Sequence, residues 1–240
     1  MKISVLTPSL NSGQYIQRAI ESVLIQDYQN FEHIIVDGHS SDETSAIVQS
    51  YEHIKYISEK DKGQSDAMNK AYEMSSGEII VYLNADDEFL PDAFKTAAKA
   101  FADNQTADMV IGDLIFKTNN ESRLVKPSPN YIDVLQYWKN LFPNNPVSYF
   151  YRRKVQEKIG KFPVDDHFSM DIWFLLKAYK NFKVVKINSV LGIFHSDGKN
   201  KTAVADLGNN LHRAVKNHLK KENPFLLPFF YFKLFSLRWK

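Results

Sequence analysis

The sequence predicts an α/β protein built on a mostly parallel sheet that is flanked by helices. Within about the first 90 residues, short apolar runs rich in Ile and Val alternate with segments whose apolar residues recur at helical spacing. Several of the apolar runs end abruptly in polar residues and carboxylates, as the carboxyl ends of buried parallel strands do. With 240 residues, 44% of them hydrophobic, the chain is long enough for one such domain and a tail.

The individual elements follow from apolar spacing and from turn residues. Strands are expected at residues 3–6, 31–36, 54–57, 79–83, 109–116, 123–125, 147–151 and 184–194. Helices are expected at residues 15–26, 41–51, 64–75, 92–102, 131–139, 153–159 and 169–179. Ser41 is predicted to cap the second helix, and Gly77 to end the third. The expected division is one domain at 1–210, with halves at 1–115 and 116–210, followed by a tail at 211–240.

Composition excludes several classes of function. The chain has no cysteine, which excludes disulfides, a thiolate nucleophile and a zinc–thiolate site, and which fits a reducing compartment. The net charge of +2 indicates no nucleic-acid partner. The apolar run at the N-terminus is too short for a signal peptide, and no segment reaches the roughly 18 apolar residues of a membrane-spanning helix. A cytoplasmic protein is therefore expected.

The tail differs in charge and composition from the rest of the chain. Residues 211–240 carry seven of the 30 Lys and Arg side chains and one of the 28 acids, so the first 210 residues are mildly acidic. Seven aromatic residues fall within 225–240. A basic, aromatic, partly helical segment is typical of an anchor at a membrane surface. The alternative is an interface in a homodimer.

Carboxylates follow two of the expected strands. Asp86 and Asp87 come just after the apolar run at 79–83, and Asp37 follows Ile34–Val36. Because the carboxyl ends of parallel strands meet at one sheet edge, these three side chains should lie near one another. Such a cluster is tolerable when a cation or ligand hydroxyl groups neutralise it, and two hard oxygen ligands suit Mg²⁺ or Mn²⁺ on a diphosphate. The alternative is that Asp86 and Asp87 cap a helix or are solvated.

Two further loops bear on the ligand. The turn after the first strand, Thr7 to Asn11, lacks the glycines of a dinucleotide fingerprint and the lysine of a P-loop. The polar stretch 61–69 precedes a helix, where Gly63 permits close backbone approach and Lys62 could meet a phosphate. A solvated, capped loop is the alternative for this second stretch.

Four of these motifs, in this order and spacing, resemble those of family-2 glycosyltransferases of GT-A fold. The resemblance is strong over residues 2–115 and weaker between 115 and 165. It is carried by Ile3-Ser4-Val5-Leu6-Thr7-Pro8-Ser9-Leu10-Asn11, by Ile35-Val36-Asp37-Gly38 with Ser40 and Asp42, by Asp61-Lys62-Gly63 with Asp66-Ala67-Met68-Asn69, and by Leu83-Asn84-Ala85-Asp86-Asp87.

The resemblance implies a binding site for a nucleotide sugar, with 1–115 as the donor half and 116–210 as the acceptor half. Thr7, Pro8 and Ser9 would border the nucleoside, and Asp37 would hydrogen-bond the base, usually uracil. Lys62 and Gly63 would flank the uridine, and Asp66 would lie close to the sugar donor. The remaining donor contacts would come from Asn84, Ala85, Asp86 and Asp87.

The resemblance also implies a divalent metal, Mg²⁺ or Mn²⁺. Asn84-Ala85-Asp86 stands where the family has Asp-x-Asp, so Asn84 replaces the first acid. Asp86 would bind the metal, with Asp87 as a second contact to the metal or the sugar. His195, after the strand at 184–194, could reach the metal or the diphosphate; the alternative is a structural or solvent-facing histidine. Lys199 and Lys201 could close over phosphates.

An inverting transfer needs a general base to take the proton of the acceptor hydroxyl. The expected base is Asp171, at the start of an apolar helix, with Asp165 and Asp166 as rivals. The bland alternative is that Asp171 only favours the N-terminus of a helix. Trp138, Tyr149 and Trp173 could stack on sugar rings, although core packing explains them equally well.

Together these features predict an enzyme that transfers a hexose from a nucleotide donor, most often UDP, to a glycan or lipid-linked acceptor in cell-surface polysaccharide synthesis. The tail would hold it at the inner face of the membrane. Two other functions are considered. A nucleotidyltransferase would need a Gly-rich, Arg-bearing loop after the first strand, which Thr7–Gly13 lacks. A weakened nucleotide-sugar-binding module would explain Asn84, but the retained acids argue against it.

Overall fold

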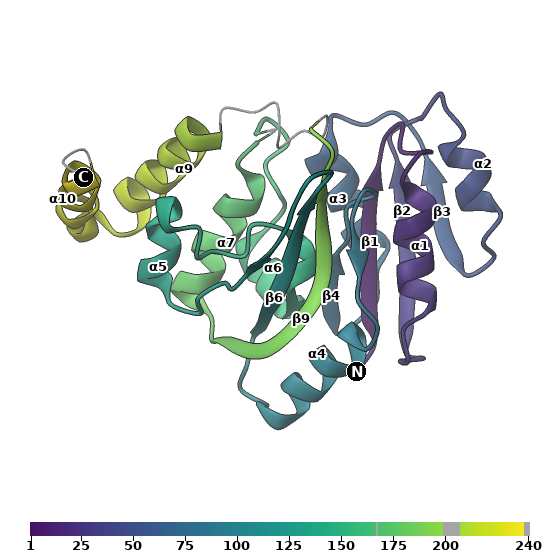
Figure 1. Ribbon diagram of the computed structural model, residues 1–240, viewed down its shortest axis with the longest axis horizontal. Coiled ribbons are helices and arrows are strands. Elements are labelled where there is room, and N and C mark those ends of the chain that lie inside the picture. Colours follow the sequence, from purple (N-terminus) through teal and green to yellow (C-terminus); the bar gives the residue numbers. More distant parts are fainter. Residues whose placement is uncertain (167, 199–206, 238–240) are drawn as a thin grey trace.

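In the computed structural model, which describes residues 1–166, 168–198 and 207–237, the first four strands form the parallel part of a nine-stranded sheet (Figure 1). Their order is β3-β2-β1-β4, and each neighbouring pair is parallel. The strands are Ile3–Ser9 (β1), Phe31–Asp37 (β2), Ile54–Ser58 (β3) and Ile79–Tyr82 (β4). Their carboxyl ends therefore meet at one edge, and the predicted α/β fold is confirmed.

The other half of the sheet mixes strand directions. β8 (Tyr149–Arg152) lies antiparallel between β4 and β6 (Met109–Thr118), and β6 runs parallel to β9 (Val184–Ser196). β7 (Ser122–Val125) forms an antiparallel pair with β6, and β5 (Glu88–Phe89) forms one with β9. The antiparallel pairs at β4–β8 and β6–β8 join the two parallel groups into one sheet.

The two-residue strand β5, which was not predicted, has the largest effect on the candidate site. It lies directly after Asp87 and pairs with β9, Glu88 opposite Ile193 and Phe89 opposite Gly192. A Cβ atom at position 192 would lie 2.6 Å from the carbonyl oxygen of Glu88, so this close approach requires glycine. The pairing brings the end of β9 beside the carboxylates that follow β4.

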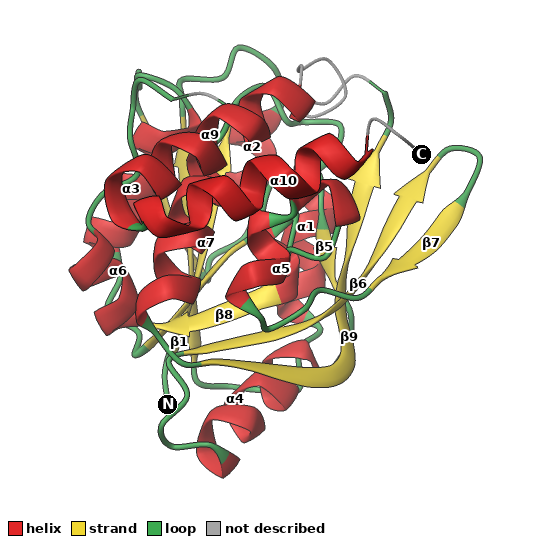
Figure 2. Ribbon diagram, turned by 90° about the vertical axis from the view of Figure 1, so that its left-hand side faces the viewer, coloured by secondary structure: helices red, strands yellow, loops and turns green. Residues whose placement is uncertain are grey.

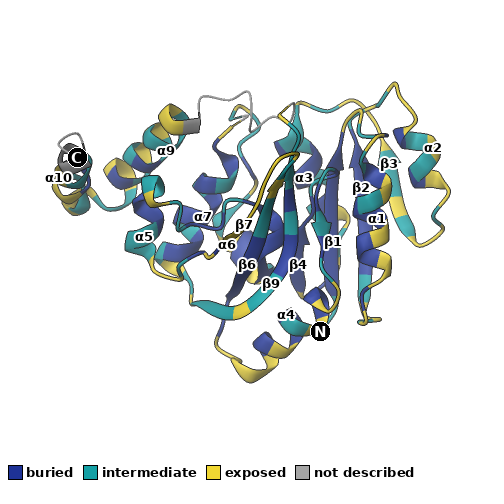
Figure 3. Ribbon diagram, in the orientation of Figure 1, coloured by how far each residue is buried: buried dark blue, intermediate teal, exposed yellow. Residues whose placement is uncertain are grey.

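Helices cover both faces of the sheet (Figure 2). α3, α6 and α7 pack on one face, and α1 and α4 pack on the other, with α2 beside α1. The central strands β1, β2, β4 and β8 are almost entirely buried, whereas β3 and much of β9 are partly exposed (Figure 3). The helices are Ile16–Leu24 (α1), Thr44–Gln49 (α2), Gln64–Met74 (α3), Ala93–Asp103 (α4), Tyr131–Leu135 (α5), Arg153–Ile159 (α6), Met170–Asn181 (α7), Leu207–Glu222 (α9) and Leu227–Leu237 (α10).

The helices that differ most from the prediction are α2 and α5, which are both shorter. α2 begins at Thr44 because Asp42, not Ser41, is in place to accept a hydrogen bond from the first turn, and it accepts the Thr44 N–H at 3.1 Å. Ser41 instead donates its N–H to Asn11. The helix predicted over 131–139 ends at Leu135, and a separate 3₁₀ turn over Tyr137–Lys139 follows.

Gly77 serves a purpose different from the predicted one. α3 already ends at Met74, and Ser75 is extended, so Gly77 does not terminate the helix. A Cβ atom at position 77 would lie 2.5 Å from Ser4 Oγ and 2.7 Å from Ser4 N. Glycine is needed here because the chain passes against the backbone of β1 as it enters β4.

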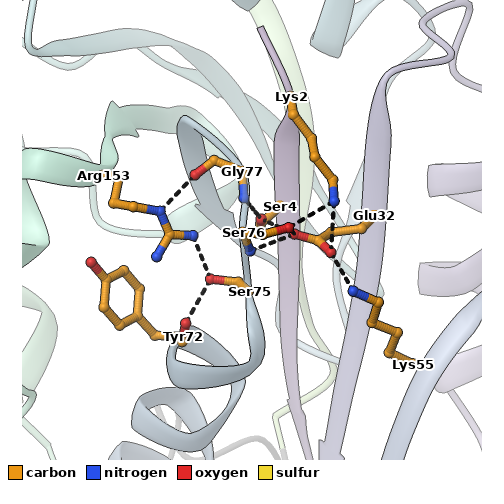
Figure 4. A network of polar contacts seen from close by, with 9 residues as sticks. All are labelled: Lys2, Ser4, Glu32, Lys55, Tyr72, Ser75, Ser76, Gly77 and Arg153. Carbon is orange, nitrogen blue, oxygen red and sulfur yellow. Dashed lines mark hydrogen bonds and ion pairs between the residues drawn. The ribbon is translucent and has the colours of Figure 1, made fainter.

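Beside Gly77, the buried carboxylate of Glu32 fastens β1, β2 and β3 to this turn (Figure 4). It accepts hydrogen bonds from Ser4 Oγ and Ser76 N, both at 2.7 Å, and it pairs with Lys55 at 2.7 Å and Lys2 at 3.0 Å. Burial alone would raise the pKa of Glu32, but these donors lower it well below its ordinary range. The network holds the amino ends of the strands, opposite the edge where the site lies.

The C-terminal segment packs in part on the domain. α9 spans residue 210, where the tail was expected to begin, and it lies along α7. Val215 and Leu219 of α9 and Phe230 of α10 are buried in the core that contains α7. The ring of Phe230 lies 5.8 Å from that of Trp138. The short turn Pro224–Leu226 (η3) joins the two helices.

Candidate active site

The loops after β1 and β2 are locked together by side-chain to backbone hydrogen bonds. Asn11, in the left-handed region with φ 47°, accepts the N–H of Ser41 at 2.9 Å and donates its own N–H to Ser40 Oγ at 2.7 Å. Gly13 N donates to Asp42 at 2.9 Å. These contacts fix the two loops as one wall of the sheet edge, because each loop satisfies the backbone of the other.

Several residues predicted to bind the nucleoside are brought to this wall. Asp37 is fully buried and accepts hydrogen bonds from Ser40 N at 2.9 Å and Ser58 Oγ at 2.8 Å. Thr7 points inward, and its Oγ1 lies 3.0 Å from His33 Nε2. Ser9 Oγ is buried without a hydrogen-bond partner among the described residues, so a bound ligand could satisfy it. Pro8 lies between them and is also buried.

The loop before α3 lies on the other side of β2. Gly63 has φ 110°, which favours glycine, and its N–H donates to Asp61 at 2.8 Å. Lys62 is exposed, while Asp66 accepts the Lys62 N–H at 3.1 Å and lies 3.4 Å from Lys70. The structure therefore leaves Lys62 available to a ligand and gives Asp66 a local partner within its own helix turn.

Asp87 forms the centre of the site. Its carboxylate is fully buried and accepts hydrogen bonds from Asn84 Nδ2 at 3.0 Å, Asn145 Nδ2 at 2.8 Å and His195 N at 3.0 Å. These donors come from the loop after β4, the loop before β8 and the end of β9. A buried carboxylate needs such donors, so Asp87 holds three separate segments at fixed positions.

Asn84 links this centre to α3. While Asn84 Nδ2 donates to Asp87, its Oδ1 accepts from Gln64 Nε2 at 3.2 Å. An aspartate at position 84 could not donate to Asp87 and would place a second negative charge beside a buried one. The departure from Asp-x-Asp thus has a structural reason: the amide supplies a donor that this arrangement requires.

Asp86 faces a different set of groups. Its carboxylate is only partly buried, and its backbone oxygen accepts a hydrogen bond from Arg18 Nη2 of α1 at 2.5 Å. Tyr15, which lies about one helix turn before Arg18, donates its hydroxyl to Asp197, directly after β9. Burial raises the pKa of Asp86, with the charge of Asp197 adding to it. Burial and the neighbouring Asp86 raise the pKa of Asp87 to about 8.

His195 belongs to this cluster through two contacts. Its backbone N–H binds Asp87, and its ring Nε2 lies 2.8 Å from Glu88 Oε1. This hydrogen bond lowers the pKa of Glu88. The cluster therefore holds more acids than bases, which favours binding of a cation.

The donor set fits a metal that the ligand itself helps to coordinate. Among the described residues, no three His, Asp or Glu side chains form a group that could hold a metal ion. Both oxygens of Asp87 accept N–H bonds, and the ring of His195 contacts Glu88, so Asp86 is the acid best placed to meet a cation. Mg²⁺ in nucleotide sites takes one or two carboxylates together with substrate phosphates, which matches this arrangement.

The start of α7 lies next to the start of α3. Ser65 Oγ donates to Met170 Sδ at 2.8 Å, while the preceding Gln64 contacts Asn84. Asp171 follows Met170 in the first turn of α7 and is partly buried. Consecutive residues of α3 thus connect the Asp87 centre to the helix turn that carries Asp171.

The rival acids are less suited to proton transfer. Asp166 accepts the N–H groups of Phe168 at 3.1 Å and Ser169 at 2.8 Å, together with the Ser169 hydroxyl. Burial would raise the pKa of Asp166, but these hydrogen bonds lower it. Its carboxylate therefore holds the turn that precedes α7, and Asp165 is exposed.

The remaining expectations have mixed outcomes. Tyr149 is buried in the core, and Trp138 packs against Phe230, so core packing accounts for both. Trp173 lines a cavity between α7 and α9. Lys199 and Lys201 lie outside the described residues.

Sequence reasoning missed Tyr15, Arg18 and Asn145. Of these three, Arg18 could have been noticed in the sequence, because it is a basic residue among the apolar residues of α1.

The chain matches the family model of glycosyl transferase family 2 over residues 4–171. An uncharacterised glycosyltransferase of Nostoc sp. is 33% identical over 180 residues, which are 69% of this chain and about half, 54%, of that protein. The putative teichuronic acid biosynthesis glycosyltransferase TuaG of Bacillus subtilis is 40% identical over 96 residues, 38% of each chain.

Solved structures are similar to this protein over most of the chain, and one of them was determined with a bound ligand. The structure of S. aureus TarS 1-349 in complex with UDP-GlcNAc superposes with a TM-score of 0.73 and 20% identity. The similarity covers 92% of this chain and 68% of that one. At this identity the likeness establishes the fold, which is the GT-A arrangement expected from the sequence.

Replacing Asn84 tests the hydrogen bonding around Asp87. Asn84→Asp should lower the free energy of unfolding by about 3 kcal/mol at pH 8, because two carboxylates then face each other in a buried site. In the folded variant, the new carboxyl group and Asp87 would have pKa values above those of the unfolded chain. The loss of stability should therefore grow as pH rises from about 4 toward 8 and shrink at acid pH.

Urea unfolding at pH 5 and pH 8 measures this difference. Asn120→Asp is the matched control, because Asn120 is exposed and its change should stay within about 0.5 kcal/mol. Equal stability of Asn84→Asp and the native protein at pH 8 would contradict the proposed hydrogen bonding.

Proposed function

The chain belongs to glycosyl transferase family 2, and on that premise we propose that it is an inverting enzyme that uses a nucleotide-sugar donor. The donor is a nucleotide-linked hexose, with UDP as the nucleotide. The acceptor is a hydroxyl group of a glycan or lipid-linked saccharide. The observation that supports the proposal is the pair of contacts of Gln64 with Asn84 and of Ser65 with Met170, which connect the loop after β4 to the first turn of α7.

In this proposal the sheet edge binds the donor. Asp37 and the buried hydroxyl of Ser9 face the nucleoside, and Lys62 with Gly63 lies along it. Asp86 would hold Mg²⁺ or Mn²⁺ together with the diphosphate, and the ion would neutralise the charge that develops on the leaving group. Asp87 fixes the loop that presents Asp86, and His195 is held beside them by Glu88.

Asp171 acts as the general base. The acceptor oxygen forms a bond to the anomeric carbon as the bond from that carbon to the diphosphate oxygen breaks. The acceptor proton passes to the Asp171 carboxylate, and the nucleoside diphosphate leaves on the opposite face, which inverts the configuration. Arg18, near Asp86, adds a positive charge on the side of the leaving group.

The acceptor class is supported by one relative, and the nucleotide by one structural neighbour. TuaG is named for teichuronic acid biosynthesis, and TarS was solved with UDP-GlcNAc. We propose that this chain likewise acts in synthesis of a cell-surface polysaccharide. The structure adds no support for a nucleotidyltransferase. In the loop after β1, Asn11 bonds to the loop after β2, and the loop lacks the glycines and arginine that such an enzyme would need.

We further propose that α10 rests on an anionic membrane surface at the cytoplasmic side. None of the described helices is long and apolar enough to cross a bilayer. Phe225 is 91% exposed, Phe232 68% and Tyr231 43%, and the neighbouring α9 carries several lysines. Exposed aromatic side chains beside basic ones suit the interface of an anionic bilayer.

Replacing the proposed base should separate chemistry from binding. Asp171→Asn should reduce sugar transfer by about 10² to 10⁴-fold, because the amide cannot accept the proton. UDP affinity should change less than about twofold, because Asp171 makes no proposed contact with the nucleotide. Transfer and UDP binding are measured on the same preparation, with Asp165→Asn as the control.

Retained transfer in Asp171→Asn would contradict the assignment and move the role to Asp165 or Asp166. Native protein that binds UDP but transfers and hydrolyses none of a panel of nucleotide sugars would favour the binding-module alternative.

Membrane contact is tested by changing exposed rings without cutting the chain. Truncation after Asn223 would also remove Phe230, which is buried in the core. Phe225→Ser with Phe232→Ser should lower binding to anionic liposomes by about tenfold or more, because exposed apolar area supplies the insertion energy. Leu124→Ser on β7, 49% exposed, is the control.

Unchanged liposome binding in the double variant would refute the membrane contact. A change from dimer to monomer in light scattering, without an effect on liposomes, would assign the same rings to a homodimer interface.

A further inference from the structure

A cavity of about 190 Å³ lies between α7 and α9, outside the donor site. Along α7 it extends from Ser169 in the cap to Lys177, so one end opens beside the turn that carries Asp171. Its wall on the other side is α9. The lining residues are Asp166, Ser169, Trp173, Lys177, Arg213, Ala214, Asn217, His218, Lys221 and Glu222.

The cations of this cavity outnumber its acids, although Asp166 interacts electrostatically with Arg213 and Glu222 with Lys177. In the described parts of the chain, no carboxylate oxygen lies within 4.0 Å of the side-chain nitrogens of Lys177, Arg213 or Lys221. Asp166 holds the turn before α7 through its hydrogen bonds to Ser169. Glu222 pairs with Lys180 at 3.0 Å, so its charge is already balanced. The cavity therefore has an excess of positive charge.

One wall of the cavity is aromatic. The Lys177 ammonium lies 4.1 Å from the centre of the Trp173 ring, so the charge and the ring lie side by side. His218 is held by Tyr131 OH at 2.7 Å, and burial lowers its pKa to about 4, so it is neutral at pH 7. Burial and then Lys221 lower the pKa of Lys177, although the charge of Glu222 partly opposes this shift.

We infer that this cavity is an acceptor subsite that binds an anionic saccharide, with its phosphate or carboxylate on Lys177, Arg213 and Lys221 and a sugar ring on Trp173. The inference rests on the proposed function and deepens it by naming the chemistry of the acceptor. Lys177 lies six residues after Asp171, about 9 Å along the helix axis. Asp171 lies on the opposite side of α7 from Trp173 and Lys177, so an acceptor anchored in the cavity would pass the N-terminal end of the helix, at Ser169, to present a hydroxyl to Asp171.

Two neighbouring lysines on α9 give a matched test. Both are exposed, but only Lys221 lines the cavity. Glucose 1-phosphate, glucuronate and glucose are titrated into the full-length protein and followed by ligand-observed NMR. At least one of the two anions should bind, glucose should bind about tenfold more weakly or not at all, and the stronger anion identifies the charged group.

Lys221→Gln and Lys177→Gln should each weaken binding of that anion by about fivefold to tenfold, and Lys220→Gln by less than twofold. Trp173→Leu should weaken binding of the sugar anion but not binding of inorganic phosphate, because only the sugar stacks on the ring. A thermal melt of each variant confirms that it is folded.

Equal effects of Lys220→Gln and Lys221→Gln would overturn the inference, since they would indicate only general surface charge. Equal binding of glucose and the two anions would overturn it as well. UDP affinity is measured in parallel. Native protein that binds UDP but neither anion refutes this subsite alone, whereas failure to bind UDP refutes the proposed function.

Discussion

The buried carboxylate of Asp87 is the interaction on which the candidate site depends. Three N–H groups from separate segments, those of Asn84, Asn145 and His195, converge on it. These donors lower the pKa of Asp87, which burial and Asp86 nevertheless raise to about 8, and without this carboxyl group the three segments would lose their common anchor. The position of Asp86, the contact of Asn84 with α3 and the course of β9 all follow from this one group.

Burying several acids at one place creates an imbalance that a ligand can relieve. The raised pKa values of Asp86 and Asp87 have the same cause, which is burial combined with nearby negative charge. A divalent cation bound with a diphosphate would offset that charge and would need only one or two protein ligands, because the phosphates supply others. On the acceptor side the imbalance is reversed, since the cavity between α7 and α9 collects cations. The two regions therefore suit ligands of different chemistry.

The sequence predicted the parallel half of the fold well, because apolar strands that end in polar residues have a strong local pattern. It did not predict β5, whose two residues carry no periodic signal and pair only through a contact with distant β9. For the same reason Asn145 was missed: its role arises from a contact with Asp87 across 58 positions. Asn84 was recognised as a departure from the family pattern, but its reason needed the geometry of its amide. Asp87 and His195 remain predicted metal contacts, although their observed partners favour Asp86 as the direct ligand.

The most direct measurement is a calorimetric titration of the protein with UDP, with and without Mn²⁺, repeated on Asp86→Asn. If the edge after β4 holds a nucleoside diphosphate through a cation on Asp86, Mn²⁺ should strengthen UDP binding by about tenfold or more in the native protein. The same addition should have less than a twofold effect in Asp86→Asn. UDP binding that is absent, or that Mn²⁺ strengthens equally in both proteins, would contradict this assignment of the site.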